Sequence, residues 1–185
     1  DGATGARRRT WVAPNDYYDS GWGDRGGYVV VADLTGSGAP NILADRSVWN
    51  LNGTLLNNRM NGRMVVGLAL ANLDNSGETA IISYEIANGS MGYVVARKPN
   101  GQVLWETPTD VNAASVSGQV VVADLHGDGM PKILVTTNGN LYVFDERGAL
   151  AWTHRFADAA NNPTIATYTR PVVFDLDGDG VPELI

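Results

Sequence analysis

The residues best suited to chemistry stand in one short acidic loop. Asp175, Asp177, Asp179 and Glu183 fill positions 1, 3, 5 and 9 of this loop, and glycines fill positions 4 and 6. A curling loop can aim every second side chain inward, and glycine permits the sharp bend. The backbone carbonyl of Val181, at position 7, can point at the same centre. Ca²⁺ takes about six to eight oxygen ligands, whereas Mg²⁺ demands a tighter octahedron, so the loop predicts a calcium site.

The acidic loop is the last of four copies of one phrase. The copies begin at Asp33, Asn72, Asp124 and Asp175. A repeat of roughly 40–50 residues is typical of a protein built from successive copies of one structural unit. The phrase therefore bears on the fold as well as on the chemistry.

The third copy is a weaker candidate for the same ion. It keeps Asp124, His126 and Asp128, and Met130 could offer its carbonyl at position 7, but Lys132 replaces the last carboxylate. An ammonium at that position can pair with Asp124 and Asp128 and take the place of a metal. We therefore leave open whether this loop binds calcium.

The first and second copies carry too few charges to predict a metal. The second keeps Asn72, Asp74 and Ser76 but has Ala80 at position 9, and Asp33 is the one formal charge among the ligand positions of the first. We expect both to be turns held by hydrogen bonds from the backbone to side chains. None of the loops is predicted to be an EF-hand, which needs a bidentate Glu at position 12 and flanking helices.

Short apolar runs surround every copy and predict β-strands. They are β-branched, and Gly, Pro and Asp bound them. Because the runs are continuous rather than alternating, we expect strands covered on both faces. The runs are 28–32, 42–44, 47–49, 54–56, 66–71, 81–84, 92–96, 102–105, 120–123, 133–136, 141–144, 149–152 and 172–174. Trp105 and Trp152, each four residues after a turn glycine, are expected to be wedges between neighbouring sheets.

Four antiparallel strands per repeat predict an all-β fold, a β-propeller or part of one. We expect an N-terminal strand and loop at 1–26, blades at 27–64, 65–116 and 117–169, and an incomplete blade at 170–185. Because three blades and part of a fourth do not close the usual ring of about four to eight, we expect a fragment of a longer protein. The alternatives are closure by a strand at 6–12, or two copies joined in one ring.

At these residues the chain resembles the FG-GAP/VCBS repeats, the calcium-binding blades of integrin-α-like propellers. The loop from Asp175 to Glu183 is similar to the family's Asp-x-Asp-x-Asp-Gly-x-x-Asp pattern, and the resemblance covers most of residues 27–185. It implies Ca²⁺ on loops at one rim of a propeller, outside the cell. Lys132, Ala80 and Asn41 depart from the pattern.

Two functions are compatible with this sequence. The first is an extracellular structural or adhesive platform whose loops contact a protein or a carbohydrate. The candidate contact loops are 14–27, which carries Tyr17, Tyr18 and Trp22, and 158–168. The second is a polysaccharide lyase of the rhamnogalacturonan-lyase type, which we consider weaker because only His126 and His154 offer an imidazole base and no catalytic constellation is evident.

Composition excludes several other classes. The formal net charge of −7 argues against nucleic acid, which selects a basic face; the run from Arg7 to Arg9 is the local exception, and we interpret it as a solvated face. The absence of cysteine excludes disulfides and thiolate metal sites. No apolar stretch approaches the ~18 residues of a membrane span. No signal peptide opens the sequence, and we expect Asp1-Gly2-Ala3 to be the start of a mature or truncated product.

Overall fold

The computed structural model describes Thr4 and residues 29–44, 47–57, 63–74, 76–87, 91–109, 118–137, 139–156 and 170–185. Within these residues the protein consists of β-strands and turns and contains no helix. The expected all-β class is therefore confirmed. The expected strand at 6–12, the basic run at 7–9 and the two candidate contact loops at 14–27 and 158–168 lie outside the described residues.

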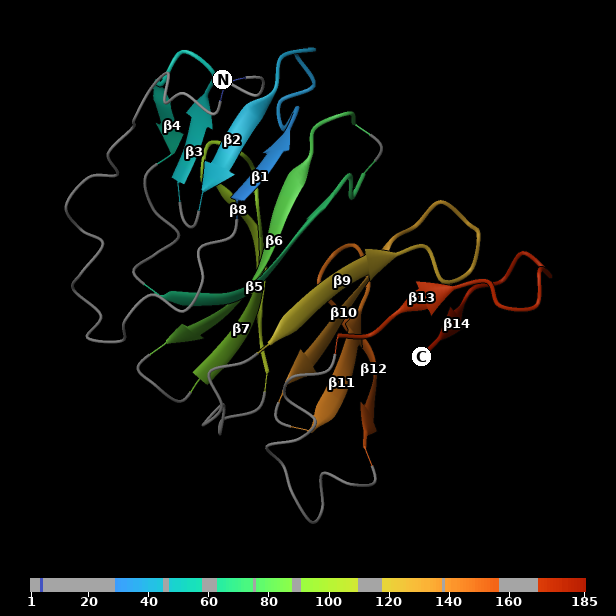
Figure 1. Ribbon diagram of the computed structural model, residues 1–185. Coiled ribbons are helices and arrows are strands. Elements are labelled where there is room, and N and C mark those ends of the chain that lie inside the picture. Colours follow the sequence, from blue (N-terminus) through green and yellow to red (C-terminus); the bar gives the residue numbers. More distant parts are fainter. Residues whose placement is uncertain are drawn as a thin grey trace.

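The strands form three four-stranded antiparallel sheets and one two-stranded hairpin, each from consecutive strands (Figure 1). The first sheet contains β1 (Val29–Ala32), β2 (Asn41–Ala44), β3 (Ser47–Asn50) and β4 (Leu55–Asn57). The second contains β5 (Met64–Ala71), β6 (Ala80–Ala87), β7 (Met91–Arg97) and β8 (Val103–Pro108). The third contains β9 (Gln119–Ala123), β10 (Lys132–Thr137), β11 (Asn140–Phe144) and β12 (Leu150–Arg155). The hairpin pairs β13 (Val173–Phe174) with β14 (Glu183–Leu184).

The repeated phrase is the turn between the first two strands of every unit. Its position 9 is always the first residue of the second strand, and it pairs with the residue directly before position 1. These pairs are Ala32 with Asn41, Ala71 with Ala80, Ala123 with Lys132, and Phe174 with Glu183. The register therefore places all four phrases at the same end of their strands.

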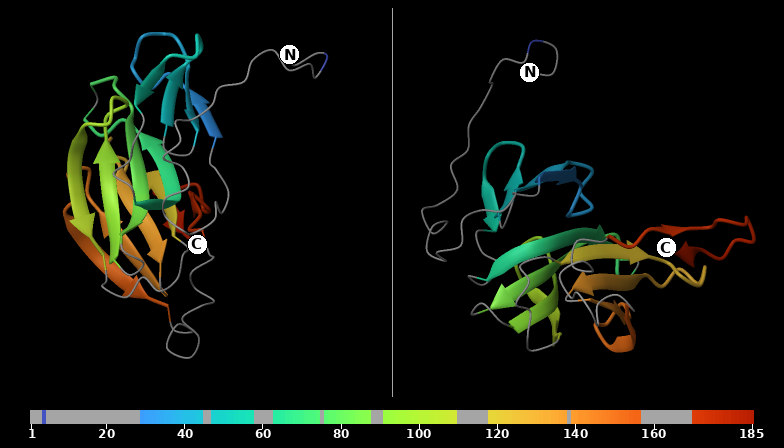
Figure 2. Two further views of the ribbon diagram at one scale, coloured as in Figure 1. Left: turned by 90° about the vertical axis from the view of Figure 1, so that its left-hand side faces the viewer. Right: turned by 60° about the horizontal axis from the view of Figure 1, so that its bottom comes forward.

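Apolar clusters hold neighbouring units together. Leu43 and Val48 of the first sheet pack with Ile81 of the second. Ile82 of the second sheet packs with Ile133 and Val135 of the third, and the two sheets lie side by side in Figure 2. A smaller cluster joins the third sheet to β13. Each fully buried aliphatic side chain contributes roughly 1.5–3 kcal/mol to stability, so these seams fix the order of the sheets.

Burial on both faces holds for the inner strands of the second and third sheets and not for β1 or for the outer strands β8 and β12. β6 is buried at every position except its last. In contrast, Val29 and Val31 on β1 are 69% and 61% exposed. The expectation of two covered faces is wrong for β1, because among the described residues no other sheet packs on that side of the first sheet.

The two tryptophans expected to be wedges differ. Trp105 on β8 packs against the cluster between the second and third sheets. Trp152 on β12 is 43% exposed, so the wedge prediction is wrong for this residue. The physical reason is that the hairpin beside the third sheet packs through Val173 on a cluster from β9, β10 and β11, and no residue of this cluster lies on the outer strand β12.

In the part of the chain that the structure describes, no helix is long and apolar enough to cross a membrane.

Candidate metal centre

The acidic loop turns between β13 and β14 because its two glycines adopt backbone angles that other residues rarely take. Gly178 has φ of 79° and Gly180 has φ of 87°, both in the left-handed region that glycine enters without a steric penalty. Two backbone hydrogen bonds between Val172 and Ile185, of 2.9 and 3.1 Å, close the hairpin beyond the strands. The loop is thus anchored at both of its ends.

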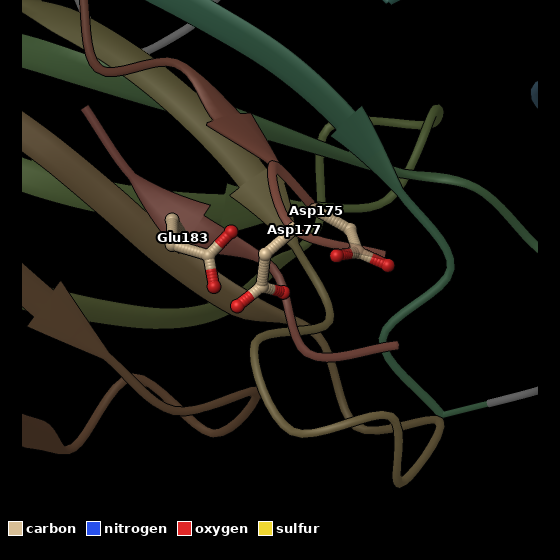
Figure 3. A group of neighbouring side chains, drawn as sticks. All are labelled: Asp175, Asp177 and Glu183. Atoms are coloured by element: carbon tan, nitrogen blue, oxygen red, sulfur yellow. The ribbon is translucent and has the colours of Figure 1, made fainter. Parts of the chain in front are cut away.

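Three carboxylates of this loop come together. Each of Asp175, Asp177 and Glu183 offers a carboxylate oxygen, and these oxygens all lie within 4.8 Å of one another (Figure 3). Asp175 and Glu183 are half-buried, whereas Asp177 is exposed. The first two lie at the facing ends of the hairpin strands, and Asp177 reaches the same place from the loop. Negative charges gathered in this way repel one another unless a cation stands among them.

Backbone N–H groups hold two of the carboxylates in position. Asp175 accepts from the N–H of Gly178 at 2.7 Å and of Gly180 at 2.9 Å, one to each oxygen. Glu183 Oε2 accepts from the N–H of Leu176 at 2.7 Å. A carboxylate oxygen has two lone pairs, so each of these oxygens retains capacity for a metal.

The spacing fits Ca²⁺. Ligand oxygens lie about 2.3–2.6 Å from a bound Ca²⁺, so two oxygens on one ion are at most about 5 Å apart. The 4.8 Å limit for the three carboxylates is within this bound. An all-oxygen, anionic donor set also suits a hard cation. Asp175, Asp177 and Glu183 could therefore hold one divalent ion.

Asp179, another predicted ligand of this loop, is placed differently. Asp179 is not part of the group of three, and its Oδ1 accepts a hydrogen bond from the N–H of Val181 at 2.8 Å. The N–H of Asp179 in turn donates to Asp177 Oδ1 at 3.2 Å. These bonds stabilise the curl of the loop.

The third loop has the same curl without the cluster. Asp124 accepts from the N–H groups of His126, Asp128 and Gly129 at 2.7–3.2 Å, and Asp128 accepts from the N–H of Met130 at 2.8 Å. The bond from Gly129 is the main reason that the pKa of Asp124 lies below its ordinary value. Among the described residues, the Asp175 group is the one set of three metal-ligating side chains that the structure gathers.

The sequence suggested that Lys132 pairs with the carboxylates of its own loop, but the structure does not show this pairing. Its Nζ lies 3.7 Å from Glu146 Oε2, in the turn between β11 and β12. Lys132 begins β10, and Phe144 at the end of β11 is opposite Ile133, so the side chain reaches the neighbouring turn within its own sheet. That prediction was wrong because it considered only the residues of the loop.

The first loop is held by the expected hydrogen bonds. Asp33 accepts from the N–H groups of Thr35, Ser37 and Gly38, and Asn41 at position 9 accepts from the N–H of Leu34 at 3.0 Å. The latter bond has its counterpart in the bond from Leu176 to Glu183. One scaffold is thus preserved where the charges are not.

The second loop pairs with a cation from outside the loop, which its own composition could not reveal. Lys98, from the turn between β7 and β8, pairs with Glu78 at 2.8 Å. Asp74 lies in the same shallow pocket, and hydrogen bonds from Ser76 are the main reason that its pKa is lowered, with the charge of Lys98 contributing. The sequence signal for this ion pair would have been the position of Lys98 at the turn between β7 and β8. This turn corresponds to the Asp145–Gly148 turn of the third sheet.

Comparison with known families supports the repeats. Residues 124–185 match the model of the FG-GAP-like repeat. These residues contain the third and fourth copies of the phrase, so the resemblance to FG-GAP repeats is confirmed there. No curated protein sequence matches the chain.

Solved structures share the fold at low sequence identity. The biofilm matrix protein Bap1 of V. cholerae matches over 80% of this chain, with 20% identity and a TM-score of 0.56. Rhamnogalacturonan lyase YesW matches over 85%, with 15% identity and a TM-score of 0.59. A rhamnogalacturonan lyase of Bacillus licheniformis matches over 85%, with 17% identity and a TM-score of 0.62. The chain spans 22% of Bap1 and 39% of each lyase.

Proposed function

Since residues 124–185 form FG-GAP-like repeats, we propose that the chain is a calcium-binding β-propeller module, or part of one. It serves as a structural or adhesive platform outside the cell. The observation that carries the proposal is the convergence of Asp175, Asp177 and Glu183 at the turn of a β-hairpin. Asp179 and the carbonyl of Val181 would complete the coordination.

The propeller is supported by the way in which the sheets repeat. Each sheet consists of four consecutive antiparallel strands, and each packs face to face on the next through an apolar seam. All four phrases lie at one end of their strands, as the loops of one rim would. On this proposal the blades are residues 27–64, 65–116 and 117–169, with 170–185 beginning a fourth.

The role of the ion would be mechanical. When bound, Ca²⁺ would supply positive charge that offsets the repulsion among the three carboxylates. Asp175 precedes the loop and Glu183 follows it, so their joint binding ties β13 to β14, and Asp177 fixes the loop between them. A two-residue pairing such as that of β13 with β14 is only marginally stable by itself. A metal cross-link at this turn would therefore add much to the stability of the hairpin.

An extracellular location agrees with a site of this kind. Millimolar calcium outside cells suits loop sites of modest affinity, and one protein that shares the fold is a biofilm matrix protein. The partners on this proposal are a protein or a carbohydrate on the loop surface.

A melting experiment tests the metal. We expect the protein to melt at a higher temperature in millimolar Ca²⁺ than in chelator, because an ion that binds the folded state alone stabilises it by about 2.7 kcal/mol at a hundredfold excess over Kd. Asp177→Ala should remove most of that difference. The matched control is Asp128→Ala, at position 5 of the third loop, which should retain it. Equal melting temperatures of the unaltered protein in both buffers would contradict the proposal.

A lyase is the alternative, because two rhamnogalacturonan lyases share the fold. The chain corresponds to less than half of each of them. The discriminating experiment incubates the calcium-loaded protein with pectic polymers and follows the absorbance of the unsaturated uronate that a lyase would produce. An increase in absorbance would favour the enzyme, and a flat trace with folded protein would reject it.

A further inference from the structure

Trp105 and Thr107, on the last strand of the second sheet, bind a turn of the third sheet. We call such a pair of side chains, which binds the turn of a neighbouring sheet, a seat. Trp105 on β8 donates its indole N–H to the carbonyl oxygen of Glu146 at 3.0 Å. Thr107, two residues further, donates its hydroxyl to the carbonyl oxygen of Gly148 at 2.6 Å. A Cβ added at Gly148 would lie 2.4 Å from the Trp105 ring. The turn fits because it ends in glycine and presents two carbonyl groups.

The same arrangement occurs between the first and second sheets. A Cβ added at Gly101, the turn glycine between β7 and β8, would lie 2.7 Å from the Asn57 side chain on β4. Asn57 stands four residues after Gly53, the turn glycine of its own sheet, just as Trp105 stands four residues after Gly101. The contact is therefore a repeated feature of the seams.

The third sheet carries the corresponding residues, and no turn from the described part of the chain packs on them. Trp152 and His154 stand four and six residues after Gly148, the places of Trp105 and Thr107 in the second sheet. They lie on one face of β12 because alternate residues of a strand share a face. Both are exposed. The indole and the imidazole, each able to donate an N–H, are thus open to a partner.

The open seat continues an interface that already exists. Val143, opposite Trp152 in the register, belongs to the cluster that packs against Val173 of β13. The inner half of this face is thus covered by the β13–β14 hairpin, while no described segment covers the outer half. In the three complete sheets the second strand pairs with a third, whereas among the described strands β14 pairs with β13 alone.

We propose that Trp152 and His154 seat the glycine turn of a β-hairpin that adds to the free edge of β14. This hairpin is the outer half of the sheet that β13 and β14 begin. The proposal rests on the propeller arrangement proposed above and names the partner of its last seam. The turn must have four residues, carbonyl groups free at its second and fourth positions, and glycine at the fourth.

A peptide that copies the third sheet's own outer hairpin is the probe. It has the sequence of residues 139–155, with Phe in place of Trp152 so that it does not contribute tryptophan emission. Added to the calcium-loaded protein, it should cause a saturable blue shift of tryptophan fluorescence, since the Trp152 ring would leave water. A second peptide, with Gly148→Val as well, should cause none, because the added side chain collides with the indole.

Protein variants assign the response to the seat. The Trp152→Phe protein should lose the blue shift, and His154→Ala should require more peptide for half-saturation. The control is Val103→Ala, since Val103 is an aliphatic residue on β8 whose side chain is about as exposed as that of Trp152. This variant should respond like the unaltered protein. Circular dichroism and calcium-dependent melting of each variant show whether it is folded.

Three results would contradict the proposed binding of a glycine turn by Trp152 and His154. The first is the absence of a saturable shift up to about 1 mM peptide. The others are an undiminished shift in the Trp152→Phe protein and an equal response to both peptides. Concentration-dependent sedimentation that Trp152→Phe abolishes would assign the surface to a second copy of the chain instead. A fluorescence response to oligogalacturonate rather than peptide would assign it to carbohydrate. The calcium-dependent melting difference does not involve Trp152, so its persistence in any of these cases leaves the metal proposal standing.

Discussion

Two neighbouring ion pairs in the second sheet have very different environments. Arg97 and Glu85 are both fully buried, and the pair is joined by two hydrogen bonds and by the hydroxyl of Ser83, which donates to Glu85 at 2.7 Å. Lys98, the next residue, pairs with Glu78 at the surface. Position relative to solvent, rather than charge, decides what each pair contributes.

We predict opposite outcomes for these two cations. Arg97→Met should lower the free energy of unfolding by about 3–5 kcal/mol, because it removes the buried cation that bonds Glu85 and leaves that carboxylate with the more distant Arg63, at 3.9 Å. Lys98→Met should lower it by less than about 1 kcal/mol, as is usual for an exposed pair. Urea unfolding at pH 7 measures both. The double variant with Glu85→Met should recover part of the loss from Arg97→Met, and equal losses in the two single variants would contradict this account.

Asp33 should make the first loop sensitive to acid. The hydrogen bond from the N–H of Gly38, with smaller contributions from Ser37 and Thr35, holds the pKa of Asp33 below its ordinary value of about 3.9. A carboxylate whose folded pKa is lowered contributes stability above its unfolded pKa and loses it as the pH falls through the folded pKa. Asp33→Asn should therefore cost stability at pH 6 and cost progressively less below about pH 4. Unfolding curves across this range measure the difference, and a pH-independent cost would contradict the assignment.

The gathering of carboxylates in the acidic loop could be predicted from sequence because the pattern is local. Alternating carboxylates and two glycines within nine residues predict the curl of the loop, and three of the four predicted carboxylates meet in it. The partners of Lys132 and Glu78 could not be predicted in this way. Both ion pairs bridge a loop and the outer turn of the same sheet, so they depend on strand register.

At the scale of elements, glycine turns fix how one sheet meets the next. Gly148 has φ of 81° and sits against Trp105, whereas Gly129 has φ of 77° and a Cβ there would meet nothing within 4 Å. Gly129→Ala should cost about 1–2 kcal/mol, from backbone conformation alone. Gly148→Ala should cost roughly 1–3 kcal/mol more, from overlap with the indole. Thermal unfolding of the two variants gives the comparison, and equal costs would show that the turn does not depend on the tryptophan.

Strand positions followed from the sequence more readily than strand environments. The run at 133–136 lies within β10, and the run at 141–144 lies within β11, because β-branched runs bounded by turn residues are a local signal. The exposure of β1 and of Trp152 was not predictable in this way. Whether a strand has a neighbour on each face is a property of the array, and an apolar run is the same sequence in both cases.

At the scale of the whole molecule, the described sheets follow one another in chain order, and exposed apolar side chains lie at each end of the series. Val29 and Val31 lie at one end, and Trp152 and Phe174 at the other. Contiguous exposed apolar patches are typical of surfaces that bind a partner, and the proposed propeller would place a neighbouring sheet against each of these two faces. The period of the repeat predicted four-stranded units, but the number of units in a ring is not encoded in any one of them.

The central claim is that one Ca²⁺ binds among Asp175, Asp177 and Glu183, and isothermal titration calorimetry of the chelator-treated protein with CaCl₂ tests it most directly. The account predicts saturable binding of one ion per chain, abolished by Asp177→Ala and retained by Asp128→Ala. No binding heat with folded protein in millimolar calcium, or full binding by the Asp177→Ala protein, would contradict it.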